Sequence, residues 1–278
     1  MFQTKTPPQE LQPATDQRTV EQLRPAAAQR QKGADVLASE VPVALQYNGI
    51  NHVVMLASGI DLIDLAYGFS FTEGIIRQSS DIYDCEVLDT DQGYVLDITI
   101  ASACLQQLKK KRRRLTGQTG CGLCGIESLA AIEHPMQPLP DGPSPLEAQA
   151  VQTALTQLSQ QQPLRALTGA THAAGWADFS GQVLCVREDV GRHNALDKLI
   201  GQLQRQAIKP DSGFVVVSSR ASYEMVQKTI TASIPALVAV SAPTSMAVEV
   251  AQNNNLILVG FARQNTFNIY NGQVLFNR

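Results

Sequence analysis

The chain has 278 residues, a length that fits one or two domains. Apolar residues make up 44% and charged residues only 17%, against a usual charged share of about 25%, so a well-packed globular protein is expected. A net charge of −3 argues against a globally basic nucleic-acid binder. The basic residues are nevertheless distributed unevenly along the chain. Six of the 22 form one run at residues 109–114, and this local concentration of positive charge needs its own explanation.

The N-terminal segment has the composition of a flexible arm. Residues 1–33 hold four prolines and seven glutamines, and they lack the apolar stretch of a secretory signal. The longest uncharged stretch, residues 229–248, contains two prolines and six Ser or Thr residues, which favours an α/β core over a membrane helix. Five cysteines, an odd number, argue against a disulfide framework. We therefore expect a cytoplasmic protein with reduced thiols and no membrane association.

Residues 34–134 predict a smaller N-terminal subdomain built from two strand pairs and two helices. Asn48-Gly49 and Gly93 mark the two hairpin turns. The expected strands are residues 41–47, 52–57, 82–88 and 94–100. One helix is expected at residues 61–69. The other begins at Ser102, carries the basic run and ends near Thr116.

A proline-rich linker at residues 135–145 separates this part from a second subdomain, residues 146–278. A helix is expected at residues 145–161, and then apolar strands rich in β-branched residues alternate with helices. This alternation predicts an α/β fold with a mostly parallel sheet covered by helices. The expected strands are residues 183–186, 214–218, 236–240 and 256–260, and the expected helices are residues 194–206, 223–233 and 245–252.

Ligands of such sheets bind outside the carboxyl ends of the strands. The segments at those ends are residues 188–194, 218–220, 241–244 and 260–265, and three of the four carry polar groups suited to a phosphate or a guanine-like ligand. In the first segment, Gly191 permits close approach of a ligand, and Arg192 and His193 offer donors to an anion near a helix start. The alternative is an ordinary helix cap followed by a solvated Asp197 and Lys198.

Residues 119–125 have the sequence TGCGLCG, with three glycines around Cys121 and Cys124. The glycines free the backbone and expose the sulfurs, and a helix expected just downstream would favour the thiolate. This pattern is typical of a nucleophilic or sulfur-carrying cysteine, although half a zinc site and a structural pair remain alternatives. A closed zinc site needs about four ligands, and the other cysteines are scattered, so no metal is predicted.

The basic run at residues 109–114 creates a strong positive field immediately before these cysteines. It suits a polyanionic substrate or an acidic partner protein. A solvated helix face and a nuclear targeting signal are the alternatives.

Several motifs together resemble the FdhD family, the formate dehydrogenase accessory sulfurtransferases, over roughly residues 40–270. The motifs are VPVA at 41–44, NG at 48–49, GF at 68–69, TEGII at 72–76, GCGLCG at 120–125, THAA at 171–174, DVGRHNALDK at 189–198 and RASYEMVQK at 220–228. Ser219 and Ala170 stand where many members have glycine, which bears on the tightness of two turns and not on the chemistry.

The resemblance implies a sulfur carrier required for formate dehydrogenase activity. Members accept sulfur from an L-cysteine desulfurase as a persulfide, here on Cys121, and transfer it to the molybdenum bis(molybdopterin guanine dinucleotide) cofactor before its insertion into formate dehydrogenase. The resemblance assigns cofactor binding to Gly260, Phe261, Ala262, Arg263, Gln264 and Asn265. It also implies a cytidine-deaminase-like α/β fold, without the metal signature, and a homodimer.

The same cofactor carries two pyrophosphates, which backbone amides and Arg263, Arg220 or Arg192 would help to hold. His193 is expected among the cofactor-binding residues as well. We expect Cys124 to tune or release the persulfide on Cys121. One rival function is a non-catalytic chaperone of the molybdenum cofactor, and another is a thiol–disulfide oxidoreductase. The oxidoreductase is disfavoured because a thioredoxin-like C-x-x-C motif follows the first strand of a βαβ unit.

Overall fold

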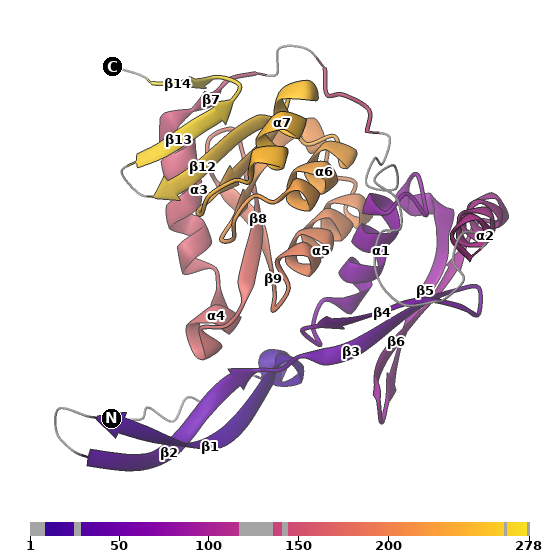
Figure 1. The fold of residues 1–278 in the computed structure, drawn as a ribbon, viewed down its shortest axis with the longest axis vertical. Coiled ribbons are helices and arrows are strands. Elements are labelled where there is room, and N and C mark those ends of the chain that lie inside the picture. The colour runs from indigo at the N-terminus through magenta and orange to yellow at the C-terminus, as the bar shows by residue number, and fades with distance from the viewer. Residues whose placement is uncertain (1–8, 25–28, 117–135, 141–143, 264–265, 277–278) are drawn as a thin grey trace.

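The computed structural model of the chain describes residues 9–24, 29–116, 136–140, 144–263 and 266–276 (Figure 1). Its two main sheets have four and six strands, and helices cover both, so the predicted α/β class with a mixed sheet and a smaller N-terminal sheet is confirmed. The cytidine-deaminase likeness and the domain boundaries stay predictions. None of the helices in the described parts of the chain is both long and apolar enough to cross a membrane.

The predicted flexible arm is wrong for much of its length. A 3-10 helix at Gln9–Ala14 leads into β1 (Thr15–Arg24), which pairs antiparallel with β2 (Gln29–Ala38) in a hairpin that extends away from the body (Figure 1). Most of its side chains are exposed. The composition of this segment therefore did not predict the two strands, because backbone hydrogen bonds hold the hairpin and these need no alternation of apolar side chains.

The two predicted hairpins form one sheet with the strand order β4-β3-β6-β5. Its members are β3 (Val41–Tyr47), β4 (Ile50–Ala57), β5 (Ile82–Thr90) and β6 (Gly93–Ile100). Asn48 and Gly49 both adopt positive φ, 48° and 74°, as the two central residues of a tight hairpin turn do. Helices α1 (Leu62–Thr72) and α2 (Ser102–Thr116) contribute Leu65 and Leu108 to the core under this sheet.

The larger sheet has the strand order β13-β12-β11-β10-β8-β9. Its members are β8 (His172–Asp178), β9 (Val183–Asp189), β10 (Gly213–Val217), β11 (Ala236–Ala239), β12 (Ile257–Arg263) and β13 (Thr266–Asn271). Strands β9, β10, β11 and β12 run parallel, as predicted, while the unpredicted β8 and β13 run antiparallel to their neighbours. A small additional pair joins β7 (Leu146–Glu147) to β14 (Val274–Leu275).

Helices cover both faces of the larger sheet. One face carries α5 (Arg192–Arg205), α6 (Tyr223–Thr231) and α7 (Ser245–Asn253), whose apolar side chains share a core with Trp176 of β8. The other face carries α3 (Ala148–Gln160), and the short helix α4 (Pro163–Thr168) follows it (Figure 1). The predicted helices of this half are therefore confirmed.

The two sheets are joined where α1 crosses α5 (Figure 1). A Cβ added at Gly68 of α1 would overlap the carbonyl oxygen of Asp197, and one added at Gly201 of α5 would overlap the carbonyl oxygen of Asp64. Only glycine therefore lets the two helix backbones come this close. The sequence repeats the same pattern on both helices, with each aspartate four residues before its glycine.

Both aspartates at this crossing are buried and held by cations. Asp64 accepts from Arg187 of β9 at 2.7 Å and also pairs with Arg205 of α5. Asp197 accepts from Lys228 Nζ at 2.9 Å and from the Thr72 hydroxyl at 2.7 Å. Burial alone lowers the pKa of Lys228, but the neighbouring carboxylates outweigh it, so the net pKa is raised and the ammonium stays charged.

Replacing Gly201 by alanine should destabilise the protein, although Gly→Ala inside a helix usually adds about 0.5–1 kcal/mol of stability. We expect a net loss of at least about 1 kcal/mol in the free energy of unfolding, because the added methyl overlaps the backbone of α1. Urea denaturation measures it. The control Gln204→Ala, on the same helix, should change the free energy by less than about 0.5 kcal/mol. A stabilised Gly201→Ala variant would contradict the close crossing.

Candidate functional site

The four parallel strands of the larger sheet end along one edge, where β8 begins. We call this edge the carboxyl edge, and it is formed by His172 and residues 189–194, 218–220, 241–244 and 260–263. Backbone hydrogen bonds join its segments, since the Phe261 amide donates to Ser241 at 3.1 Å and the Ser241 amide donates to Ser219 at 3.3 Å. The structure thus brings together the segments that the sequence predicted at the strand ends.

The end of β12 has an unusual backbone. Phe261 adopts a φ of 50°, which is uncommon for a bulky residue, and its side chain is 42% exposed. Before it, a Cβ at Gly260 would lie 2.7 Å from Pro243 Cδ, so this strand approaches its neighbour closely. The bulge turns an aromatic ring outward at the edge, where it offers a stacking surface for a flat ligand.

The other predicted cofactor-binding residues of this segment differ in accessibility. Ala262 is buried and contributes backbone only, whereas Arg263 is exposed, as is Arg220 after β10. Neither guanidinium makes an ion pair with a carboxylate of the described residues. Gln264 and Asn265 lie outside the described residues. The edge therefore presents positive charge that the described part of the chain does not neutralise.

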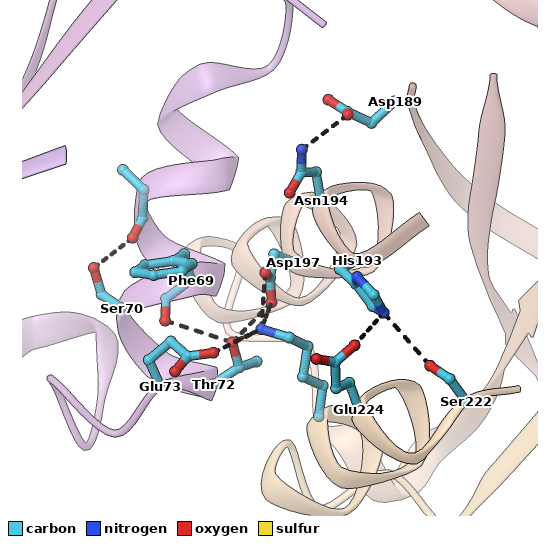
Figure 2. A network of polar contacts seen from close by, with 12 residues as sticks. Phe69, Ser70, Thr72, Glu73, Asp189, His193, Asn194, Asp197, Ser222 and Glu224 are labelled. Carbon is cyan, nitrogen blue, oxygen red and sulfur yellow. Dashed lines mark hydrogen bonds and ion pairs between the residues drawn. The ribbon is translucent and has the colours of Figure 1, made fainter. Parts of the chain in front are cut away.

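His193, in the first turn of α5, points toward α6 (Figure 2). Its Nε2 lies 2.6 Å from Glu224 Oε2 and 3.4 Å from the Ser222 hydroxyl. Burial lowers the pKa of His193, and the charges of Arg192, Lys228 and Arg220 lower it further, while Glu224 opposes them. The imidazole is therefore neutral at neutral pH and is oriented by Glu224. Sequence reasoning missed Glu224 and Ser222 as partners, although both lie within four residues of Arg220 in the sequence.

The loop before His193 is anchored to the smaller sheet. Asp189 is fully buried, and its carboxylate accepts from Lys198 Nζ at 2.6 Å and from the Ser58 amide at 2.9 Å. Asn194 donates to the carbonyl of Leu56 at 2.9 Å. It also donates to Asp189 at 3.1 Å (Figure 2). These contacts fix the loop that carries Arg192 and His193.

The alternative in which Asp197 and Lys198 are solvated cap residues is wrong. Both are buried, with 2% and 0% of their surface exposed, because α5 lies between the two sheets. The sequence held one signal for this burial, since the two charges interrupt a run of otherwise apolar residues at positions 195–200.

The predicted cysteine site, formed by Cys121 and Cys124, lies outside the described residues. The basic run, residues 109–114, occupies the last turns of α2, and Lys109 and Lys110 are exposed. The described parts of the chain contain no group of three metal-ligating side chains, and the predicted absence of a metal stays a prediction.

A cleft of about 420 Å³ lies elsewhere, between α1, the smaller sheet and β9. It is lined in part by Asp61, Asp64, Arg187 and Arg205. These two acids and two arginines pair with one another, so the cleft has no charge left for a ligand. We place the functional site at the carboxyl edge instead.

Comparison with known proteins assigns the family. The model of the FdhD/NarQ family matches residues 38–275. The chain belongs to this family. The β1–β2 hairpin lies almost wholly outside the matched residues.

Curated relatives match over most of both chains. The protein named Sulfur carrier protein FdhD of Bordetella petrii is 52% identical over 237 residues, which cover 85% of each chain, and that of Variovorax paradoxus is 49% identical over 85% and 84%. A crystal structure of a candidate formate dehydrogenase accessory protein from Desulfotalea psychrophila matches with a TM-score of 0.72 and 22% identity. It covers 94% of this chain and 98% of its own, and at this identity it supports the fold alone.

Titration of His193 tests the geometry of the carboxyl edge. We expect its pKa below the usual 6.5, and a further fall in Glu224→Gln, because that substitution removes the carboxylate that raises it. Ring-proton NMR of the labelled protein measures both values. Glu249→Gln, on the exposed side of α7, should leave the titration unchanged. A His193 pKa that ignores Glu224→Gln would show that the pair does not form, and a pKa above 6.5 would show that burial does not outweigh Glu224.

Proposed function

We propose that this protein is a sulfur carrier required for formate dehydrogenase activity. The observation that carries the proposal is an identity of about one half, across most of both chains, to proteins named Sulfur carrier protein FdhD. The chain also has the C-G-L-C-G motif at residues 121–125 that such a role requires.

In this proposal, Cys121 carries the sulfur. Its thiolate attacks the outer sulfur of a persulfide on an L-cysteine desulfurase, a new S–S bond forms at Cys121, and the desulfurase cysteine leaves as a thiolate. The basic end of α2, five residues before the motif, favours the thiolate by its positive charge. Cys124 then tunes or releases the persulfide.

The substrate that receives the sulfur is, in this proposal, the molybdenum bis(molybdopterin guanine dinucleotide) cofactor. The carboxyl edge suits its nucleotide ends, since Arg220 and Arg263 are exposed and form no ion pair among the described residues, and Phe261 offers a stacking surface. His193, which burial keeps neutral and Glu224 orients, would donate or accept a hydrogen bond there. A homodimer is part of the same proposal, and analytical ultracentrifugation of the purified protein tests it.

Cys121 and Cys124 should differ in function. After incubation with an L-cysteine desulfurase and cysteine, mass spectrometry should find one additional sulfur atom on Cys121, and Cys121→Ala should abolish formate oxidation in a strain that lacks the protein. Cys124→Ala should keep part of that activity, because sulfur transfer needs one carrier thiolate whereas disulfide exchange needs two thiols.

Cys185→Ala is the matched control, since this thiol lies half-buried in β9 and should not contribute. Full activity of Cys121→Ala would overturn the proposal. Equal and complete loss in both motif variants would favour a thiol–disulfide oxidoreductase, and cofactor binding without sulfur loading would favour a chaperone.

Guanine nucleotides should bind at the carboxyl edge. Arg263→Ala should weaken GDP binding by about 1.5–3 kcal/mol, if its guanidinium makes a charge-assisted hydrogen bond to a phosphate. Isothermal titration calorimetry measures the change, and Lys209→Ala, at the opposite edge of the sheet, should have no effect. GDP affinity that is unchanged in Arg263→Ala would remove Arg263 from the site.

A further inference from the structure

The described core of the smaller sheet lies on one of the two faces of that sheet. Val43 and Leu45 of β3 point into this core, where α1 and α2 contribute their apolar side chains. Successive residues of a strand point to opposite faces, so Pro42, Ala44 and Gln46 point away from the core. We call the side on which these three residues lie the outer face.

The outer face carries apolar side chains where a solvated sheet face usually carries polar ones. Strand pairing aligns Val54 of β4 with Ala44 of β3, and Leu88 of β5 with Val95 of β6. Ala44 and Val95 are also aligned, so these four residues form one apolar row across the whole sheet. Val54 is 66% exposed and Leu88 is 42% exposed, and Leu56 extends the row toward the end of β4. Exposed apolar surface that is contiguous in this way marks a binding surface.

The charge of this sheet is entirely negative. Its strands and their turns, residues 41–57 and 82–100, hold five acidic residues and no lysine or arginine. Glu86 and Asp97 are aligned on the outer face, one row from the apolar row. Neither forms an ion pair with a described residue. Complementary charge therefore favours a partner with a basic surface and disfavours a second copy of the same face.

The outer face adjoins the carboxyl edge. The backbone carbonyl of Leu56 accepts from the Asn194 side chain at 2.9 Å. Two residues further on, the Ser58 amide donates to Asp189 at 2.9 Å. These contacts join the end of β4 to the loop at residues 189–194, so a protein that covers Leu56 lies beside the carboxyl edge.

We propose that the outer face docks the protein that takes the cofactor from the carboxyl edge. The inference rests on the proposed function, in which that protein is formate dehydrogenase. The cofactor is a polyanion with two pyrophosphates, so the entrance of the site that accepts it needs basic groups. Those basic groups face Glu86 and Asp97 when the apolar row is covered, and the cofactor has only a short way to travel.

The test measures binding of formate dehydrogenase, made in a strain that lacks the cofactor, to the full-length protein by biolayer interferometry. Val54→Lys should weaken this binding about tenfold or more, because it places a cation in the apolar row against a basic surface. Leu184→Lys is the matched control, since Leu184 is 54% exposed but lies on β9 of the larger sheet. It should change the affinity by less than about twofold.

The acidic residues should act on the rate of association. Glu86→Gln combined with Asp97→Asn should slow association about three- to tenfold at low salt and make it less sensitive to salt, because charges beside an interface mainly steer the encounter. Glu249→Gln, which removes an exposed acid of α7, should leave the rate unchanged. An association rate that the double substitution does not alter would overturn the basic partner.

A further measurement uses the unmodified protein, so it does not depend on the folding of a variant. Strands β4 and β5 are the two edges of the smaller sheet. Hydrogen exchange of their amides, at residues 50–57 and 82–90, should slow when formate dehydrogenase is added, since a docked protein stabilises the strands that it covers. Exchange that is unchanged in both strands would overturn the docking surface.

The outcomes separate this inference from the proposed function. Equal affinity of Val54→Lys and the parent protein for formate dehydrogenase would overturn the docking surface, and sulfur on Cys121 of the parent would leave the proposed function standing. A Val54→Lys variant that instead loses the desulfurase, or its own second copy, would overturn formate dehydrogenase as the occupant. Formate dehydrogenase binding that depends on Val54, without sulfur on Cys121, would support the surface and overturn the sulfur carrier.

Discussion

The structure depends on one close contact, the crossing of α1 and α5, where no side chain separates the helices. Gly68 and Gly201 lie against the backbone of the opposite helix. The aspartate one turn before each glycine is buried and bound by basic side chains of the larger subdomain. Removing one partner of such a buried pair would leave an uncompensated charge, so the glycines and the charges together permit a single way of joining the two sheets.

The position of the loop at the carboxyl edge depends on that contact between α1 and α5. The loop at residues 189–194 is held to the smaller sheet through Asp189 and Asn194, and between them it presents Arg192 and His193. A binding residue whose neighbours are fixed on both sides loses little conformational entropy when a ligand arrives. The fully buried residues of the DVGRHNALDK motif therefore position its half-buried residues, among them Arg192 and His193.

Local sequence signals predicted the parts of the fold that depend on local physics. The turn at residues 48–49 and the β-branched strands β10 to β12 were evident, but β8 was not, because its sequence, HAAGWAD, has no β-branched residue. The strand ends could be located because polar residues follow apolar runs. The contact of His193 with Glu224 and the burial of Asp197 and Lys198 could not be predicted from the sequence. Each arises from helices that meet only in the folded chain.

The same crossing sets an order of events during synthesis. Thr72 and its partner Asp197 are 125 residues apart in the chain, so α1 is made well before the helix that covers it. At about 5–20 residues per second, α1 is without its partner helix for roughly 6–25 s, during which Gly68 and Asp64 are open to water. Until α5 is made, the face of α1 around Gly68 lacks the helix that covers it.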